Sequence, residues 1–154
     1  MPSPILQKEL PNEAEMATFA ASFVPVLRAG DTLLLSGQIG AGKSAFARGF
    51  IRAKLGRMED VPSPTFTLVQ TYDVAETEIW HCDLYRLTHP DEALELGLED
   101  AFETAVCLVE WPDRLGDAAP EGALHLAFEA GPTAHHVSIA GSAEWKDRLQ
   151  ALDV

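Results

Sequence analysis

Several features are scarce in this sequence of 154 residues, and each scarcity excludes a class of protein. Two cysteines are too few for the disulfide framework of a small secreted domain or for a cysteine-rich zinc site. No apolar run approaches the roughly 18–20 residues that a membrane-spanning helix needs. The sequence also opens without a basic leader followed by a long apolar core, so no secretory signal is expected. These absences favour a cytoplasmic location.

Positive charge is scarce as well. The chain has 11 Lys and Arg residues against 24 Asp and Glu residues, which gives a net charge of −13. A stand-alone nucleic-acid binder normally has the opposite sign, because neutralising phosphates supplies most of its affinity. The positive charge is unevenly placed, since residues 37–58 hold five of the 11 basic residues and no acidic one. We therefore expect any contact with nucleic acid to be indirect.

The apolar pattern predicts a single domain of alternating helices and strands. A chain of 154 residues, 47% of them hydrophobic, suits one compact core. Strands are expected at residues Thr32–Ser36, 66–72, 78–84 and 105–109, with an antiparallel pair at 122–130 and His135–Ala140. Helices are expected between Asn12 and Pro25, at Lys43–Leu55, at 91–102 with a break at Gly97, and from Ser142 to about Leu152. Residues 1–11 contain three prolines and are expected to form an irregular arm.

The most informative motif lies between the first expected strand and the helix that follows it. Residues 37–44 read Gly-Gln-Ile-Gly-Ala-Gly-Lys-Ser and match the P-loop pattern G-x-x-x-x-G-K-[ST]. Glycines let backbone N–H groups approach phosphate oxygens, the helix N-terminus favours the same anion, and the serine hydroxyl can bind Mg²⁺. The expected nucleotide-binding residues are Gly37, Gln38, Ile39, Gly40, Ala41, Gly42, Lys43, Ser44 and Ala45. The motif predicts an α/β P-loop NTPase domain whose mixed sheet has a parallel core, antiparallel late strands and flanking helices.

Two acidic residues stand at the ends of expected strands. Glu110 follows the apolar run 105–109, and Asp83 follows the shorter run 79–82. In open α/β sheets, ligands bind beyond the carboxyl ends of the parallel strands, so both carboxylates can face the γ-phosphate and its Mg²⁺. The alternative is that each acid is merely the first solvated residue after its strand.

Other polar residues carry weaker predictions. Thr65, in a Ser-Pro-Thr loop, is a candidate switch residue near the γ-phosphate, although this sequence is also ordinary loop chemistry. His81 is either an acid–base group or a structural histidine. The pair at 135–136 is interpreted as structural, and Cys82 and Cys107 as small core residues.

Three functions are compatible with a P-loop in this setting. The guanine-reading motif Asn-Lys-x-Asp is missing, and no arginine-bearing lid of the kind found in nucleotide kinases is visible. The remaining candidates are an ATPase with an accessory role, a small-molecule kinase, and a nucleotide-gated binding module that scarcely hydrolyses ATP.

Four segments together resemble the TsaE (YjeE) family in order and spacing. They are 37–44, the Ser-Pro-Thr-Phe run at 63–66, the His-Cys-Asp-Leu-Tyr-Arg run at 81–86, and the Glu-Trp-Pro run at 110–112. The resemblance implies a bacterial P-loop ATPase needed for threonylcarbamoyladenosine modification next to the anticodon of tRNA. It also implies Mg²⁺ and ATP as cofactors, the TsaB–TsaD pair as partners, and contact with tRNA only through that complex.

The same resemblance implies roles for individual residues. Ser44, Asp83 and Glu110 would lie at the metal, with the two acids and Thr65 needed for catalysis. Trp111 would lie close to the nucleotide. The chain departs from the family pattern at Gln38, where the family usually has Asp.

The basic residues of the P-loop helix suggest a further hypothesis. Arg48 and Arg52 are four residues apart and share one helical face. We expect this face, with Arg86, to contact a partner protein or tRNA, or alternatively to be a solvated helix face.

Overall fold

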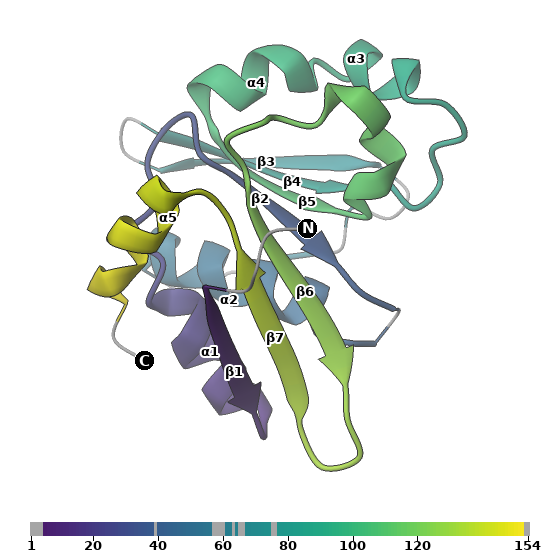
Figure 1. The fold of residues 1–154 in the computed structure, drawn as a ribbon. Helices are drawn as coiled ribbons and strands as arrows, with labels where there is room; N and C mark the ends of the chain where they lie inside the picture. Colours follow the sequence, from purple (N-terminus) through teal and green to yellow (C-terminus); the bar gives the residue numbers. More distant parts are fainter. Residues whose placement is uncertain are drawn as a thin grey trace.

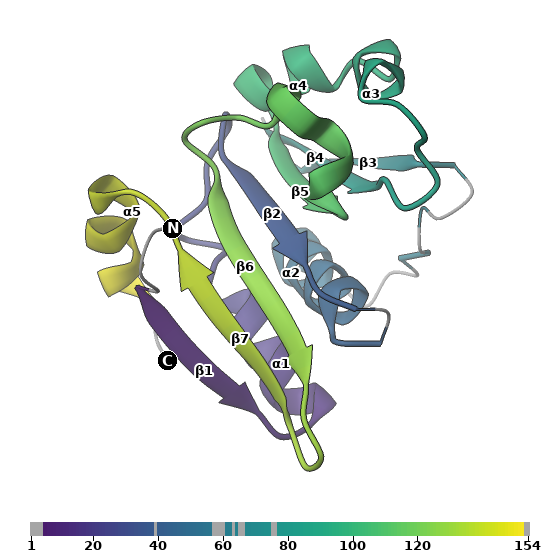
Figure 2. The ribbon, with the colours of Figure 1, turned by 45° about the vertical axis from the view of Figure 1, so that its right-hand side comes forward.

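Seven strands form one mixed sheet in the computed structural model, which describes residues 5–38, 40–56, 61–62, 64, 67–74 and 77–152. The strand order is β1-β7-β6-β2-β5-β4-β3 (Figures 1 and 2). Strands β6, β2, β5 and β4 run parallel, and β3, β7 and β1 pair antiparallel with their neighbours. The strands are β1 (Leu6–Leu10), β2 (Thr32–Ser36), β3 (Val69–Val74), β4 (Thr77–Asp83), β5 (Val106–Glu110), β6 (Leu124–Ala130) and β7 (His135–Ala140). The predicted parallel core and antiparallel late pair are confirmed.

Helices cover both faces of this sheet (Figures 1 and 2). The α-helices are α1 (Glu13–Ala21), α2 (Lys43–Leu55), α3 (Asp91–Glu95), α4 (Leu98–Thr104) and α5 (Ala143–Arg148). Two 3₁₀ segments follow β5 and α5, at Pro112–Ala118 and Leu149–Ala151. Within the described ranges, no helix combines the length and apolarity needed to cross a bilayer.

The core is split by the sheet because successive strand residues point to opposite faces. Leu33 and Leu35 of β2 pack with α1 and α2, whereas Leu34 packs with α3 and α4. Strand β5 alternates in the same way and is buried along its whole length, as its uninterrupted apolar run predicts. The sheet therefore fixes which residues at its carboxyl edge can reach the P-loop.

The N-terminal arm is the main error of the sequence-based prediction. Leu6–Leu10 form β1, which pairs antiparallel with β7 from Leu6↔Ile139 to Leu10↔His135. The prolines at positions 2, 4 and 11 flank this segment, so its backbone N–H groups remain able to pair. Burial of Leu10 adds an apolar contact that a local pattern of five residues does not reveal.

Other boundaries shift by smaller amounts. Asn12 caps α1 as expected, with its side-chain oxygen accepting a hydrogen bond from the Glu15 N–H at 2.8 Å. The final α-helix ends early, at Arg148, and continues as a 3₁₀ turn. The strand expected at 66–72 begins at Val69 among the described residues.

Candidate functional site

The P-loop spans the connection from the carboxyl end of β2 to the first turn of α2, and its glycines are required by shape. Gly37 has φ +137°, and a Cβ there would lie 2.4 Å from the carbonyl oxygen of Phe128. Gly42 has φ +118°, and a Cβ there would lie 2.7 Å from Met16 Cε and 3.2 Å from His135 Nδ1. Both positions have left-handed backbone, which disfavours any side chain, and at Gly37 a Cβ would also clash with the backbone of β6. The loop thus keeps its inner surface as bare backbone.

Lys43 is the first residue of α2 and is 4% exposed. Its Nζ donates a hydrogen bond to the Gly37 carbonyl oxygen at 2.5 Å and lies 3.5 Å from the centroid of the Trp111 ring. Desolvation lowers the pKa of Lys43, while the negative charges of Glu110, Asp83 and Asp113 act in the opposite direction. The hydrogen bond and the ring contact therefore hold the Lys43 ammonium between the Gly37 carbonyl of the loop and the Trp111 ring.

Glu110 is the last residue of β5 and is 2% exposed. Its Oε1 accepts a hydrogen bond from Ser44 Oγ at 3.0 Å, and its Oε2 lies 2.7 Å from His81 Nε2. The carboxylate thus joins the P-loop helix to β4 and β5. Because it is buried and bonded on both oxygens, the alternative of a solvated residue after the strand is wrong for Glu110.

Asp83 ends β4 directly beside Glu110, its partner in the β4–β5 register. It is 5% exposed, and its Oδ1 accepts a hydrogen bond from the Tyr85 N–H at 3.1 Å. The Asp83 backbone N–H donates to the Leu68 carbonyl oxygen at 2.9 Å, which anchors the end of the strand. The sheet therefore brings both predicted acids to the same edge as the P-loop.

A cavity of about 420 Å³ unites these groups. Its lining residues come from the P-loop and α2, from the ends of β4 and β5, and from the start of β7: Gly40, Gly42, Lys43, Ser44, Ala45, Arg48, Asp83, Tyr85, Glu110, Trp111 and His135. Trp111 has a left-handed backbone, with φ 59° and ψ 54°, which is costly for a bulky residue. Its ring lies 5.0 Å from that of Tyr85, so two aromatic residues stand at the cavity beside Lys43.

Comparison with known proteins identifies the family. A family model described as threonylcarbamoyl adenosine biosynthesis protein TsaE matches residues 10–137. The chain belongs to the TsaE family. It is 40% identical to the protein of that name from Rickettsia bellii over 74% of this chain and 79% of the relative. The identity to the Haemophilus influenzae protein is 33%, over 87% of this chain and 88% of the relative.

The fold is also similar to a solved structure. The crystal structure of YdiB from Bacillus subtilis superposes with a TM-score of 0.78 at 28% sequence identity. The match covers 94% of this chain and 91% of YdiB. The similarity therefore extends well beyond the four motifs that carry the resemblance.

Sequence reasoning missed three residues of the TsaE cavity. Arg48 and Tyr85 both line the cavity, and Tyr85 follows Asp83 by two residues within the His-Cys-Asp-Leu-Tyr-Arg run at 81–86. His135 was interpreted as structural, yet it lines the cavity beside Gly42. No local pattern reveals His135, because the β6–β7 hairpin brings it to the P-loop from 93 positions further along the chain.

Not every predicted site residue is placed at the cavity. Gln38 is exposed, Ala41 is buried, and neither of them lines the cavity. Gly37 is also outside the cavity lining, although its carbonyl oxygen accepts the hydrogen bond from Lys43. Ile39 and Thr65 fall outside the described residues, so the predictions for them stay predictions.

The donors at the TsaE cavity suit a Mg²⁺–nucleotide complex. Ser44, Glu110 and Asp83 supply hydroxyl and carboxylate oxygens, which are the hard ligands that Mg²⁺ prefers. The described part of the chain contains no group of three or more His, Cys, Asp or Glu residues able to hold a metal ion. Mg²⁺ does not require such a cage, because it keeps several waters and shares phosphate oxygens.

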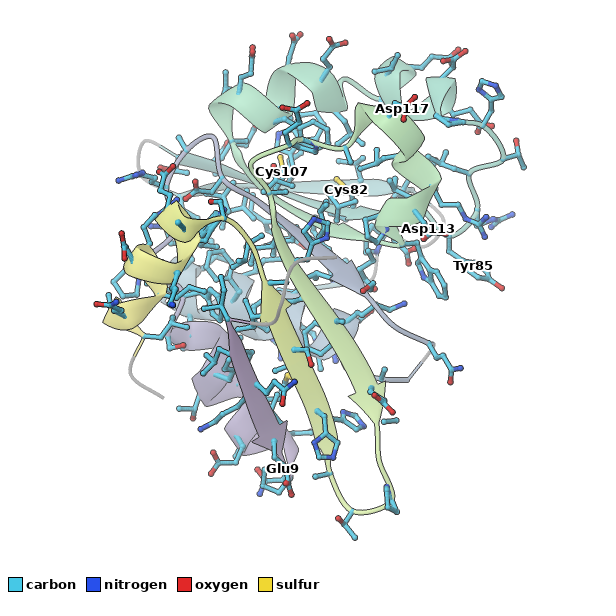
Figure 3. The ribbon with its side chains drawn as sticks, viewed as in Figure 1. Glu9, Cys82, Tyr85, Cys107, Asp113 and Asp117 are labelled. Atoms are coloured by element: carbon cyan, nitrogen blue, oxygen red, sulfur yellow. The ribbon has the colours of Figure 1, made fainter. Side chains whose placement is uncertain are left out.

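The two cysteines take no part in this chemistry. Figure 3 shows Cys82 and Cys107 inside the molecule, and both pack in the cluster beneath α3 and α4. Burial raises the pKa of the Cys107 thiol to about 12 and raises that of Cys82 well above its usual range. Their burial confirms the interpretation as small core residues. Thiols with a pKa raised in this way are neutral and unreactive.

Proposed function

We propose that this TsaE-family chain is a Mg²⁺-dependent ATPase that supports threonylcarbamoyl modification of the adenosine next to the anticodon in tRNA. The observation that carries the proposal is the hydrogen bond from Ser44 to Glu110 at the mouth of a glycine loop that also holds Lys43. A P-loop hydroxyl bonded to a strand-end carboxylate is the arrangement that nucleotide hydrolases use to hold a metal. Family membership supplies the biological setting.

Each residue has a distinct part in the proposed reaction. The P-loop backbone N–H groups and the N-terminus of α2 bind phosphate oxygens. Lys43 exchanges its bond to the Gly37 carbonyl for the β- and γ-phosphates. Ser44 and Glu110 bind the metal, and Asp83 positions metal or water from the neighbouring strand. Mg²⁺ held by these residues would neutralise the charge that develops on the γ-phosphate.

The residues that line the cavity lead to a proposed orientation for the nucleotide. Asp83 and Glu110 mark the end for the γ-phosphate. Ala45 and His135 also line a second cavity of about 280 Å³, whose other lining includes Pro11 and the first turn of α1. We place the nucleoside toward this second cavity, because it shares Ala45 and His135 with the first cavity and is lined by neither Asp83 nor Glu110.

Nucleotide binding tests this proposal before any partner is added. Titration of the purified chain with ATP and Mg²⁺ is expected to change tryptophan fluorescence, because Trp111 lies against Lys43. A Trp111→Phe variant that still binds ATP in equilibrium dialysis but no longer shows the fluorescence change would assign the signal to that ring. GTP is the control for base preference. No binding of ATP at millimolar concentration by either method would contradict the proposal.

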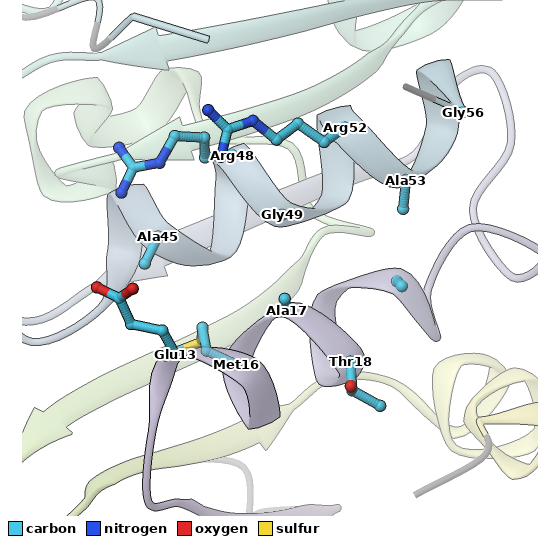
Figure 4. A pocket seen from close by; sticks show the side chains of 11 residues that line it. Glu13, Met16, Ala17, Thr18, Ala45, Arg48, Gly49, Arg52, Ala53 and Gly56 are labelled. Carbon is cyan, nitrogen blue, oxygen red and sulfur yellow. The ribbon is translucent and has the colours of Figure 1, made fainter. Parts of the chain in front are cut away.

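Partner binding is the second part of the proposal. We propose that the TsaB–TsaD pair binds this chain and holds the tRNA, because a protein of net charge −13 is a poor ligand for tRNA by itself. A cavity of about 570 Å³ lies between α1 and α2, and its lining includes Arg48 and Arg52. Figure 4 shows these two side chains on α2. Arg48 lines the nucleotide cavity as well, so a partner at this groove would contact a residue of the nucleotide site.

Charge reversal tests this surface. The double variant Arg48→Glu/Arg52→Glu is expected to weaken binding to the TsaB–TsaD pair about tenfold or more at physiological salt, because it replaces attraction with repulsion. The measurement is calorimetric titration with the assembled pair, with ATP affinity measured alongside. Lys146→Glu, an exposed change on α5, is the control and should alter neither value more than about twofold. Unchanged complex formation and turnover in the double variant would eliminate this surface.

A further inference from the structure

His81 and Glu110 meet inside the protein from neighbouring strands. His81 Nε2 lies 2.7 Å from Glu110 Oε2, with side-chain exposures of 2% and 3%. An ionised carboxylate can only accept hydrogen bonds, so with Glu110 ionised the shared hydrogen is carried by Nε2 of His81. Glu110 Oε1 accepts the Ser44 hydrogen bond, so each carboxylate oxygen has its own protein donor.

The other ring nitrogen of His81 finds no hydrogen-bond partner among the described residues. Nδ1 is buried and makes no hydrogen bond within the part of the chain that the structure describes. A structural histidine normally satisfies both nitrogens, since an unmet buried polar atom costs about 1–3 kcal/mol. Within the described residues, the hydrogen bond to Glu110 is the side-chain polar contact that orients the ring. This arrangement costs stability, but it suits a residue whose side-chain hydrogen bond orients the Glu110 carboxylate.

The position of His81 explains how it reaches that carboxylate. It lies two residues before Asp83 on β4, so both side chains project from the same face of the strand. Glu110 on β5 pairs in register with Asp83. His81 therefore lies on the same face of the sheet, two residues further from the end of β4. Asp83 faces the cavity, whereas His81 supports Glu110 from behind.

We propose that His81 is a positioning residue that fixes the rotation of the Glu110 carboxylate. The proposal deepens the proposed ATPase function and rests on it. A free glutamate carboxyl rotates broadly about its last bond. With Oε2 held by His81, Oε1 stays directed at Ser44, where the metal of the nucleotide would bind. Donors of this kind, behind a metal ligand, typically change metal affinity 10–100-fold when removed.

A matched pair of substitutions isolates this hydrogen bond. In His81→Gln the amide nitrogen can take the place of Nε2, whereas in His81→Asn the side chain is one methylene shorter and falls short of Glu110. ADP affinity is measured in EDTA and in Mg²⁺ for the wild type and both variants. His81→Asn is expected to lose about tenfold or more of the gain in affinity that Mg²⁺ supplies. His81→Gln should keep most of that gain, and the affinities in EDTA should agree within about twofold.

Equal behaviour of the two variants, whether both keep or both lose the Mg²⁺ gain, would overturn the positioning role. So would a wild-type protein that binds ADP equally well with and without Mg²⁺. A wild type that binds no nucleotide would instead refute the proposed function.

Imidazole nitrogen NMR of the wild type gives an independent answer that does not depend on variant folding. The proton is expected on Nε2, and its resonance should shift when Mg²⁺–ADP is added. A bare Nε2, or a resonance indifferent to Mg²⁺–ADP, would contradict the proposal.

Discussion

Replacing Lys43 with alanine is expected to weaken ATP binding about 100-fold or more. Lys43 is 4% exposed, and its ammonium donates a hydrogen bond to the Gly37 carbonyl oxygen of the P-loop. Two charge-assisted hydrogen bonds to phosphate, at about 1.5–3 kcal/mol each, account for a loss of this size. The measurement is the equilibrium dissociation constant for ATP in Mg²⁺.

The control for this variant lies on the same helix. Lys54 is in the last turn of α2, away from the loop, so Lys54→Ala should leave ATP affinity within about twofold of the wild type. Thermal unfolding of Lys43→Ala shows whether the fold is kept. Wild-type affinity in a folded Lys43→Ala protein would refute the assignment of the phosphate site.

Replacing Glu110 with glutamine is expected to reduce ATP turnover about 100–1000-fold, the range found when one preorganised electrostatic group is removed from an active site. The substitution keeps the size of the side chain but removes the charge that faces Ser44. ATP affinity measured in EDTA should stay within a few fold, because the P-loop and Lys43 are untouched. Single-turnover hydrolysis with the TsaB–TsaD pair present separates the chemical step from binding.

Two companion variants sharpen this prediction. Asp83→Ala should also spare binding and lower turnover, since Asp83 lies beside Glu110 at the same strand edge. Glu121→Gln changes an exposed acid outside the cavity and should leave turnover unchanged. Undiminished turnover in both site variants would remove the acids from the mechanism.

The placement of the P-loop and of the two strand-end acids can be predicted from local sequence, because each belongs to a short local pattern. The P-loop carries its own spacing, and its flanking strand and helix were predicted at the observed bounds, Thr32–Ser36 and Lys43–Leu55. The buried run of β5 located Glu110, and the rule that ligands bind at the carboxyl ends of parallel strands brought in Asp83. Each inference needed only a short window of the chain.

What escaped prediction depends on contacts between distant segments. Strand β1 forms because it pairs with β7, and the local sequence of residues 6–10 does not indicate this pairing. His135 reaches the P-loop only after the β6–β7 hairpin has formed. The local sequence does not decide between the two roles of His81, because its hydrogen bond to Glu110 depends on the β4–β5 register. Spacing in sequence cannot report a register set by a sheet of seven strands.

The measurement that tests the account most directly is Mg²⁺-dependent ATP hydrolysis by this chain, alone and with the TsaB–TsaD pair from the same organism, with GTP as the control. The account predicts slow turnover alone and a clear rise when the pair is added, abolished by Lys43→Ala. High turnover alone, or turnover that requires a small-molecule acceptor and ignores the pair, would contradict the accessory role and favour a kinase.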